Sequence, residues 1–132
     1  MCAVAGHSIE ITTLYSDAAT NTTHFRPDFI PWLDNKTSAD SNARVPSRTD
    51  LFPASSIGYL RLPAGFRSDW HPAPRKQYVM VLRGMMEVEA GDGERRTFMA
   101  GMVLLVTDVQ GRGHRTNVIS TEDVFLVWVP IP

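Results

Sequence analysis

Short apolar segments alternate with glycine-bearing turns through the second half of this 132-residue chain, and this alternation restricts the fold more than any other feature. Within residues 85–90, Glu87 and Glu89 alternate with Met86 and Val88, which is typical of a strand with one wet and one buried face. No segment shows the 3.6-residue period of an amphipathic helix. Many short strands joined by regular turns predict an all-β sandwich or barrel. The expected strands are residues 57–62, 78–82, 85–90, 94–99, 102–106, 114–119 and 124–129.

Fewer strands are predicted in the first third of the chain. Residues 9–15 are rich in β-branched side chains and predict a first strand. Residues 24–33 contain Pro27 and Pro31, which exclude a helix through the middle of the segment. Because proline donates no ladder hydrogen bond, this segment is expected to be irregular or to form an edge strand.

A polar stretch separates these strands from the main strand-rich region. Residues 35–50 are rich in Ser, Asp, Asn and Thr, which predicts a long loop or an arm lying across the mouth of a barrel. Too little chain precedes it to form a separate domain. We therefore expect one domain over residues 1–132, with a barrel core at about 56–130 and an N-terminal arm at 1–55.

Composition excludes several classes of function. The net charge is −1, with acids and bases interspersed, so neither nucleic acid nor an anionic membrane surface is an expected partner. No run approaches the 18 apolar residues of a membrane span. Cys2 is the only cysteine, so no intrachain disulfide can form. The start of the chain has neither the basic nor the long apolar region of a signal peptide, and we expect a cytoplasmic protein.

Two distant histidines are predicted to share the interior of the barrel. A two-residue period starting from His71, carried through the proline-bent segment, places a set of side chains on one side of the chain. That set is Ala73, Gln77, Val79 and Val81. The same phase starting from His114 carries Thr116 and Val118 inward, and Met86 and Val88 face inward opposite the two glutamates.

The last strand leaves two alternatives open: either Phe125 and Val127 or Leu126 and Trp128 line the interior. In both cases a few polar groups lie in an apolar hollow, which is the usual composition of a small-molecule site.

Residues 65–84 resemble the first motif of the cupins, G-x5-H-x-H-x3-E-x6-G. Gly65, His71 and Gly84 stand at the motif's spacings. Ala73 replaces the second histidine, and Gln77 replaces the glutamate.

The second cupin motif, G-x5-P-x-G-x2-H-x3-N, is matched more loosely. Gly93 and Gly101 keep their spacing, and Met99 takes the place of the proline. The histidine comes late, at His114, and Asn117 is one residue short of its offset. The whole chain is similar to small single-domain cupins of unassigned function, some of whose relatives are polyketide-tailoring enzymes. The resemblance implies a double-stranded β-helix (a jelly-roll barrel), often a homodimer, with its site inside the barrel.

Metal binding is where the chain departs from the cupin pattern. The resemblance implies a divalent metal held by three histidines and one glutamate, but two of these four ligands are changed. Alanine supplies no ligand, and a glutamine amide oxygen is a weaker ligand than a carboxylate. His71, Gln77 and His114 are the candidate metal ligands. The expected cofactor is therefore either none or a weakly bound divalent metal (Fe, Zn, Ni or Mn).

Three functions stay open. The first is a small-molecule enzyme without redox chemistry, in which His71 and His114 exchange a proton and Gln77 holds a carbonyl or enolate oxygen. Dehydration, isomerisation, cyclisation and decarboxylation of an apolar aromatic or polyketide-like substrate are all of this kind. The second is an iron-dependent dioxygenase. The third is a barrel that binds a small molecule without catalysis.

Substrate contacts are expected from the remaining interior residues, with Trp70 stacking on an aromatic ligand. The predicted substrate-binding residues are Trp70, Val79, Val81, Met86 and Thr116. Arg112 and Arg115 flank His114 and are interpreted as solvated, with contact to an acidic substrate as the alternative. Asp108 is interpreted as a turn residue rather than a partner of an imidazole. His24 is expected at the surface.

Overall fold

The computed structural model describes residues 8–33 and 46–132, and within them it contains nine strands and no helix. The strands are β1 (Ser8–Ser16), β2 (Thr23–Pro31), β3 (Gly58–Leu62), β4 (Gln77–Arg83), β5 (Met85–Glu89), β6 (Arg95–Met99), β7 (Val103–Val106), β8 (Arg115–Val118) and β9 (Val124–Pro130). Each predicted strand is present, with bounds that differ by one or two residues, and the prediction of an all-β fold is confirmed.

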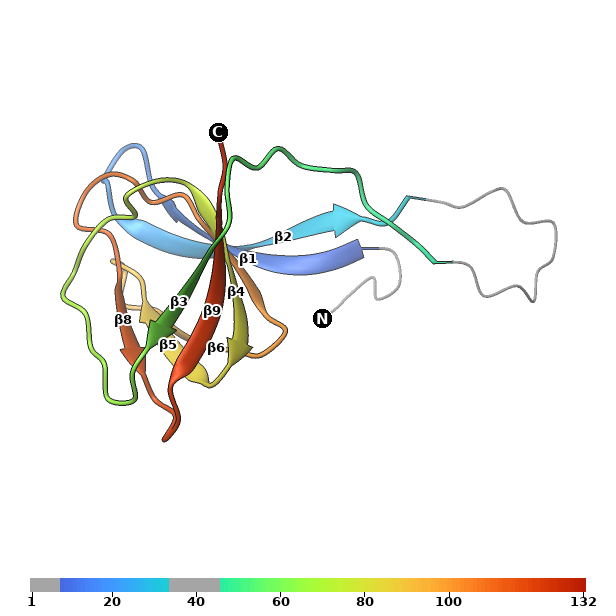
Figure 1. Cartoon of the computed structure of the whole chain (residues 1–132). Coiled ribbons are helices and arrows are strands. Elements are labelled where there is room, and N and C mark those ends of the chain that lie inside the picture. The colour runs from blue at the N-terminus through green and yellow to red at the C-terminus, as the bar shows by residue number, and fades with distance from the viewer. Residues whose placement is uncertain (1–7, 34–45) are drawn as a thin grey trace, which may run out of the picture.

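The strands form two sheets (Figure 1). The larger sheet has the order β2-β1-β7-β4-β9-β3, and the smaller has the order β6-β5-β8. All the pairings are antiparallel except that of β1 with β7, which is parallel. Strands that are neighbours in a sheet are often distant in sequence, as in a jelly-roll barrel. The architecture is the double-stranded β-helix that the cupin resemblance implies.

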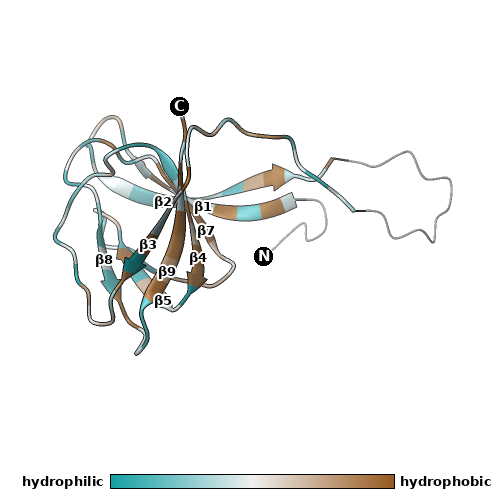
Figure 2. Cartoon of the chain, viewed as in Figure 1, coloured by the Kyte–Doolittle hydropathy of each residue, from teal (hydrophilic) through white to brown (hydrophobic). Residues whose placement is uncertain are grey.

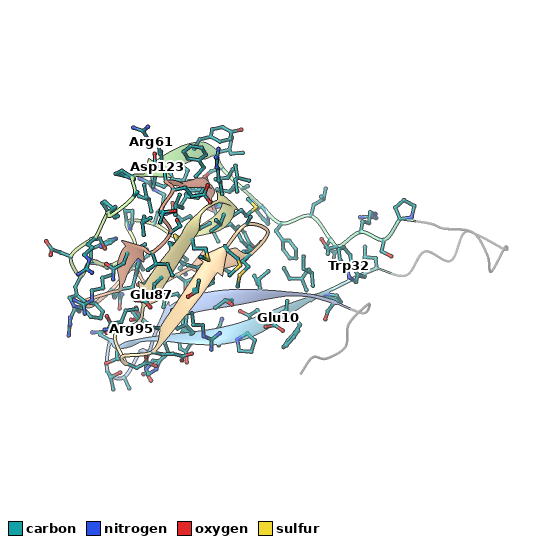
Figure 3. All side chains as sticks on the ribbon, turned by 90° about the horizontal axis from the view of Figure 1, so that it is seen from below. Glu10, Trp32, Arg61, Glu87, Arg95 and Asp123 are labelled. Atoms are coloured by element: carbon teal, nitrogen blue, oxygen red, sulfur yellow. The ribbon has the colours of Figure 1, made fainter. Side chains whose placement is uncertain are left out.

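The core lies between the sheets because each strand turns alternate apolar side chains inward. Figure 2 shows apolar residues concentrated on β4 and β9, in the middle of the larger sheet. Met86 and Val88 are 3% and 1% exposed, which confirms the predicted phase of residues 85–90. Charged side chains such as Arg61, Arg95 and Asp123 lie at the periphery (Figure 3).

The N-terminal hairpin is part of this core. β1 pairs with β7, and β2 forms the outer edge of the larger sheet, as its two prolines predicted. Phe25 of β2 is 8% exposed, and its ring centroid lies 6.2 Å from that of Phe98 on β6. Residues 8–31 therefore supply two strands to the larger sheet, which is a closer association than an arm beside the barrel.

The predicted arm at residues 35–50 is only partly described, because residues 35–45 lie outside the described residues. Leu33 forms an isolated antiparallel bridge with Arg48. Residues 49–54 line a groove with outward side chains of the larger sheet, among them Tyr78 and Met80. The described part of this segment therefore lies on the outside of the barrel and not across its mouth.

No helix in residues 8–33 or 46–132 is long and apolar enough to cross a membrane.

An irregular segment closes the barrel beside β8. The backbone of Phe66 accepts a hydrogen bond from Val118, and that of Ser68 donates one to Thr116. His71 and His114 then exchange two backbone hydrogen bonds of 2.9 and 3.0 Å. The chain approaches so closely here that a Cβ atom on Gly113 would lie 2.0 Å from the His71 carbonyl oxygen. Glycine is needed at residue 113 for this packing and for its φ of +80°.

We expect Gly113→Ala to destabilise the protein by more than about 2 kcal/mol, because it combines left-handed strain with a backbone clash. Gly93→Ala is the matched control, since Gly93 has a φ of +92° but no atom within 4 Å of an added Cβ. That variant should lose only the strain of about 1–2 kcal/mol. Urea unfolding of both variants measures the difference, and equal losses would contradict the close approach of the two segments.

Candidate functional site

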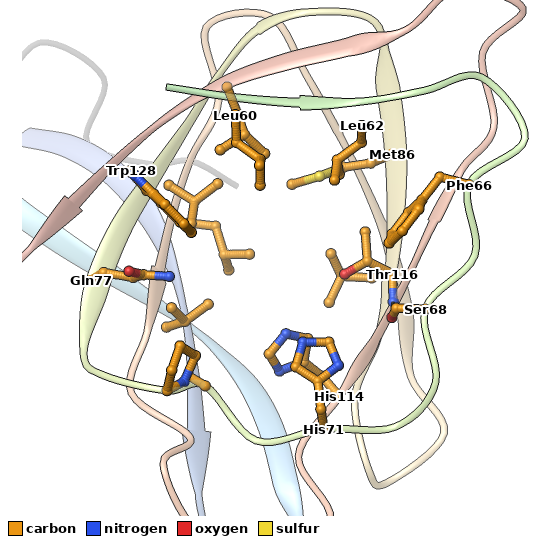
Figure 4. A pocket seen from close by; sticks show the side chains of 17 residues that line it. Leu60, Leu62, Phe66, Ser68, His71, Gln77, Met86, His114, Thr116 and Trp128 are labelled. Carbon is orange, nitrogen blue, oxygen red and sulfur yellow. The ribbon is translucent and has the colours of Figure 1, made fainter. Parts of the chain in front are cut away.

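The hollow between the sheets is a pocket of about 310 Å³ (Figure 4). This volume is near the lower end of the roughly 300–1,000 Å³ that is usual for small-molecule sites. Both sheets and the irregular segment after β3 contribute to its wall. The apolar lining residues are Leu60, Leu62, Phe66, Ala73, Pro74, Val79, Met86, Val88, Leu104, Val106, Leu126 and Trp128. The polar lining residues are Ser68, His71, Gln77, His114 and Thr116.

Most of the predicted site residues meet in this pocket. His71, Gln77 and His114 all line it, as do Val79, Met86 and Thr116. Val81 shares the predicted inward phase and is 2% exposed, but it packs in the core and does not line the pocket. For the last strand, Leu126 and Trp128 are the residues that face the pocket.

Sequence reasoning missed part of the wall. Leu60 and Leu62 follow a two-residue period on β3, so the pattern of that strand held the signal. Phe66 and Ser68 lie in a segment without a regular pattern, and they reach the pocket only because the segment pairs with β8.

The two histidines lie side by side at one end of the pocket (Figure 4). Their ring centroids are 4.8 Å apart and their planes are inclined by 53°. The cause is the backbone bridge between them, because directly paired residues on adjacent antiparallel segments hold their side chains close together. His114 is 8% exposed, whereas His71 is exposed.

Asp108 holds the ring of His114 in place. The Nδ1 atom of His114 lies 2.5 Å from Oδ2 of Asp108, whose side chain is 0% exposed. A carboxylate only accepts hydrogen bonds, so Nδ1 carries the proton and donates it. The interpretation of Asp108 as a turn residue is therefore wrong. The loop does turn here, but it also carries the carboxylate inward, and its carbonyl accepts a hydrogen bond from the amide of Ala73.

The ring of His71 is held in the same tautomer. Its Nδ1 atom donates to the carbonyl oxygen of Asp69 at 2.9 Å, because a carbonyl can only accept. In the neutral form of both rings Nε2 is then the nitrogen without a proton, and the histidine side of the pocket presents two lone pairs.

Gln77 lines a different side of the hollow from the histidines (Figure 4). Its side chain is 6% exposed, and its Oε1 atom is buried without a hydrogen-bond partner. The amide nitrogen lies on the side of the hollow, so this residue offers N–H donors to a ligand (Figure 4).

The residues around Trp70 lie outside the pocket. The guanidinium carbons of Arg112 and Arg115 lie 3.8 and 4.9 Å from the Trp70 ring centroid. Arg115 also donates to Glu89 at 2.8 Å. None of these three side chains lines the pocket, because the chain alternates and Trp70 points away from the side that His71 faces. His24 lies elsewhere, half-buried and 2.8 Å from Asp92.

The residues present do not fit a tightly held divalent metal. Ala73 provides no donor, and the buried oxygen of Gln77 is turned away from the hollow, which leaves two imidazoles. Within the described parts of the chain, no three His, Cys, Asp or Glu side chains are grouped to share an ion. We therefore assign no metal to the site.

Elemental analysis of protein purified without chelator tests this donor set. We expect well under one equivalent of Fe, Zn, Ni or Mn per chain, and no change in His71→Ala, because two neutral imidazoles bind divalent ions weakly. The double variant Ala73→His, Gln77→Glu restores the two missing ligands and should gain metal, which makes it the positive control. Near-stoichiometric metal that disappears in His71→Ala would contradict the expectation.

Solved structures that are similar to this chain include several cupin domains. No protein-family model matches the chain, and no curated protein matches its sequence. A cupin 2 conserved barrel protein from Salinispora arenicola is 24% identical, with 55% of this chain and 60% of that protein covered and a TM-score of 0.42. This chain thus spans less than two thirds of that protein.

Two further structures are similar over more of the chain. The cupin domain of Schizosaccharomyces pombe Cnp3 is 16% identical over 93% of this chain and 88% of that domain, with a TM-score of 0.48. An RmlC-like cupin from Methanocaldococcus jannaschii is 16% identical over 76% of this chain and 90% of that protein, with a TM-score of 0.42. Sequence identities this low allow a comparison of folds only and carry no information about activity. The chain's own two sheets, with the pocket between them, have the double-stranded β-helix architecture.

Proposed function

We propose that this protein is a small-molecule enzyme that transfers a proton without redox chemistry inside the barrel. The observation that carries the proposal is the buried hydrogen bond between His114 and Asp108, beside a second imidazole in an apolar pocket. A histidine whose Nδ1–H is held by a carboxylate presents a lone pair at Nε2, and the carboxylate stabilises the imidazolium that forms.

His114 acts as the base in this reaction. Its Nε2 atom removes a proton from a carbon next to a ligand carbonyl, and the electrons of the broken C–H bond move to the carbonyl oxygen. The amide of Gln77 donates a hydrogen bond to the resulting enolate oxygen. A proton returns to another carbon of the same ligand, or a leaving group departs, so no electrons enter or leave the system.

His71 connects this chemistry to water. Its ring is exposed and in contact with that of His114, whereas His114 is buried. A proton taken up at His114 is thereby passed towards solvent through an imidazole that keeps its own Nε2 lone pair. This division of roles supports a proton-transfer enzyme over a barrel that only binds its ligand.

Hydrogen–deuterium exchange at carbon tests the proposal without knowledge of the natural substrate. Tetralone, a fused-ring aromatic ketone, is incubated with the protein in heavy water, and loss of the proton next to its carbonyl is followed by NMR. We expect His114→Asn to lower the catalysed exchange at least about a hundredfold, the usual contribution of a general base. The asparagine amide can still donate to Asp108, so the fold is preserved.

The control is His24→Asn, because His24 also pairs with a carboxylate, Asp92, but outside the pocket. That variant should exchange at the wild-type rate. Tight binding of tetralone with no exchange above the buffer rate would show a binding protein instead. Unchanged exchange in His114→Asn would remove His114 from its role.

Asp108 is predicted to be a positioning residue. Asp108→Asn removes the negative charge behind His114, so the imidazolium formed during exchange loses its stabilisation. We expect exchange to fall about tenfold or more while the affinity for tetralone, measured by calorimetry, stays within about twofold. A parallel loss of affinity and thermal stability would indicate that Asp108 only supports the fold.

A further inference from the structure

The hydrogen-bonding groups of the pocket define a class of substrate. This inference rests on the proposed function, because it assumes that the pocket holds the reacting molecule. Three features of the pocket carry the inference: the charges around it, the hydrogen-bond donors and acceptors on its walls, and the shape of those walls.

No positively charged side chain lines the pocket among the described residues. The two arginines near His114 stack on Trp70 on the outside of the barrel. A negative charge lies directly behind His114, on the buried carboxylate of Asp108. A ligand carboxylate would lose its hydration, gain no cation and lie near another anion. The pocket therefore disfavours acids, and the acidic-substrate alternative for Arg112 and Arg115 has no support inside it.

Two sides of the pocket have opposite hydrogen-bonding character. In its neutral form each imidazole donates its N–H to a protein acceptor, so the histidine side of the pocket offers two lone pairs. A ligand must bring a hydrogen-bond donor to that side, such as a hydroxyl. Gln77, on another side of the hollow, offers an amide N–H and has its oxygen buried, so a ligand must bring an acceptor there. Ligands that lack either group leave a buried polar group without its bond.

The walls of the pocket favour a ligand that is flat and apolar between its two polar groups. Phe66 and Trp128 present aromatic side chains, and the rest of the wall is mostly aliphatic. A volume of about 310 Å³ suits a small ligand rather than a long chain. Thr116 carries a hydroxyl beside the histidines and can donate or accept.

From these features we infer that the substrates of this protein are uncharged aromatic or fused-ring hydroxy-carbonyl compounds. Their hydroxyl binds Nε2 of His71 and their carbonyl binds the amide of Gln77, which leaves Nε2 of His114 facing the carbon next to the carbonyl.

A matched set of fused-ring ligands tests the inference by calorimetry on the full chain. The parent is a hydroxytetralone with its phenol hydroxyl on the aromatic ring and its ketone on the saturated ring. Three analogues each change one group: the methoxy ether lacks the donor, the carboxylate replaces the hydroxyl with a negative charge, and the tetrahydronaphthol lacks the ketone. We expect the ether and the tetrahydronaphthol to bind about tenfold more weakly than the parent, and the carboxylate about a hundredfold more weakly.

Variants assign each ligand group to its partner. Gln77→Met keeps the size of the side chain and removes its hydrogen-bond donor. It should weaken the binding of the hydroxytetralone about tenfold and leave the affinity for the tetrahydronaphthol unchanged. Gln110→Met is the matched control, because Gln110 is exposed and lies outside the pocket. It should change neither affinity.

The outcomes separate this inference from the proposed catalysis. A carboxylate that binds as well as the parent, a parent that does not bind at all, or an ether equal to the parent would each overturn the substrate class. Preferential binding of the hydroxytetralone without exchange at its carbon would support the substrate class and reject the proton-transfer proposal. Equal exchange of tetralones with and without the hydroxyl, combined with equal affinity, would keep the catalysis and reject the donor requirement.

Discussion

The two-way backbone hydrogen bond between His71 and His114 is the contact on which the site depends. It joins an irregular segment after β3 to the start of β8, and so brings together residues that are 43 positions apart in the chain. The close approach requires glycine at position 113, where any side chain would meet the His71 carbonyl. Because the two residues are directly paired, their rings face the same hollow. The bridge continues the pairing that Phe66 and Ser68 of the same segment make with β8, and together these contacts form one wall of the pocket.

The apolar walls of the pocket strengthen the hydrogen bonds that its few polar groups make. In a hollow walled mainly by aliphatic and aromatic side chains, a hydrogen bond between a carboxylate and an imidazole is stronger than in water. The Asp108–His114 pair is therefore well suited to hold one tautomer. The same apolar surroundings make it unfavourable to bury an unpaired charge of a ligand. The low polarity of the pocket therefore strengthens the Asp108–His114 hydrogen bond and disfavours a ligand carboxylate.

The departures from the cupin metal pattern have a consistent structural meaning. Ala73 packs in the core at 4% exposure, where a histidine would project an imidazole towards the pair. Gln77 keeps the length of a glutamate but presents a donor in place of a negative charge. The pocket therefore holds two imidazoles, one carboxylate behind them and an amide on another side. Such a set suits proton transfer to or from a bound organic molecule.

The sequence alone determined the strands, their inward faces and the candidate residues, because alternation and turn residues are local properties of the chain. It identified His71, Gln77 and His114 as pocket residues, and it placed Met86, Val88 and Thr116 correctly. Only the tertiary structure decided which phase of β9 faces inward, that Trp70 and its two arginines lie outside, and that Asp108 reaches His114. These depend on strand pairing and on the path of irregular loops, where no periodic pattern exists. A loop carboxylate six residues before a histidine has no preferred direction in sequence, and its role appears only when the fold encloses both.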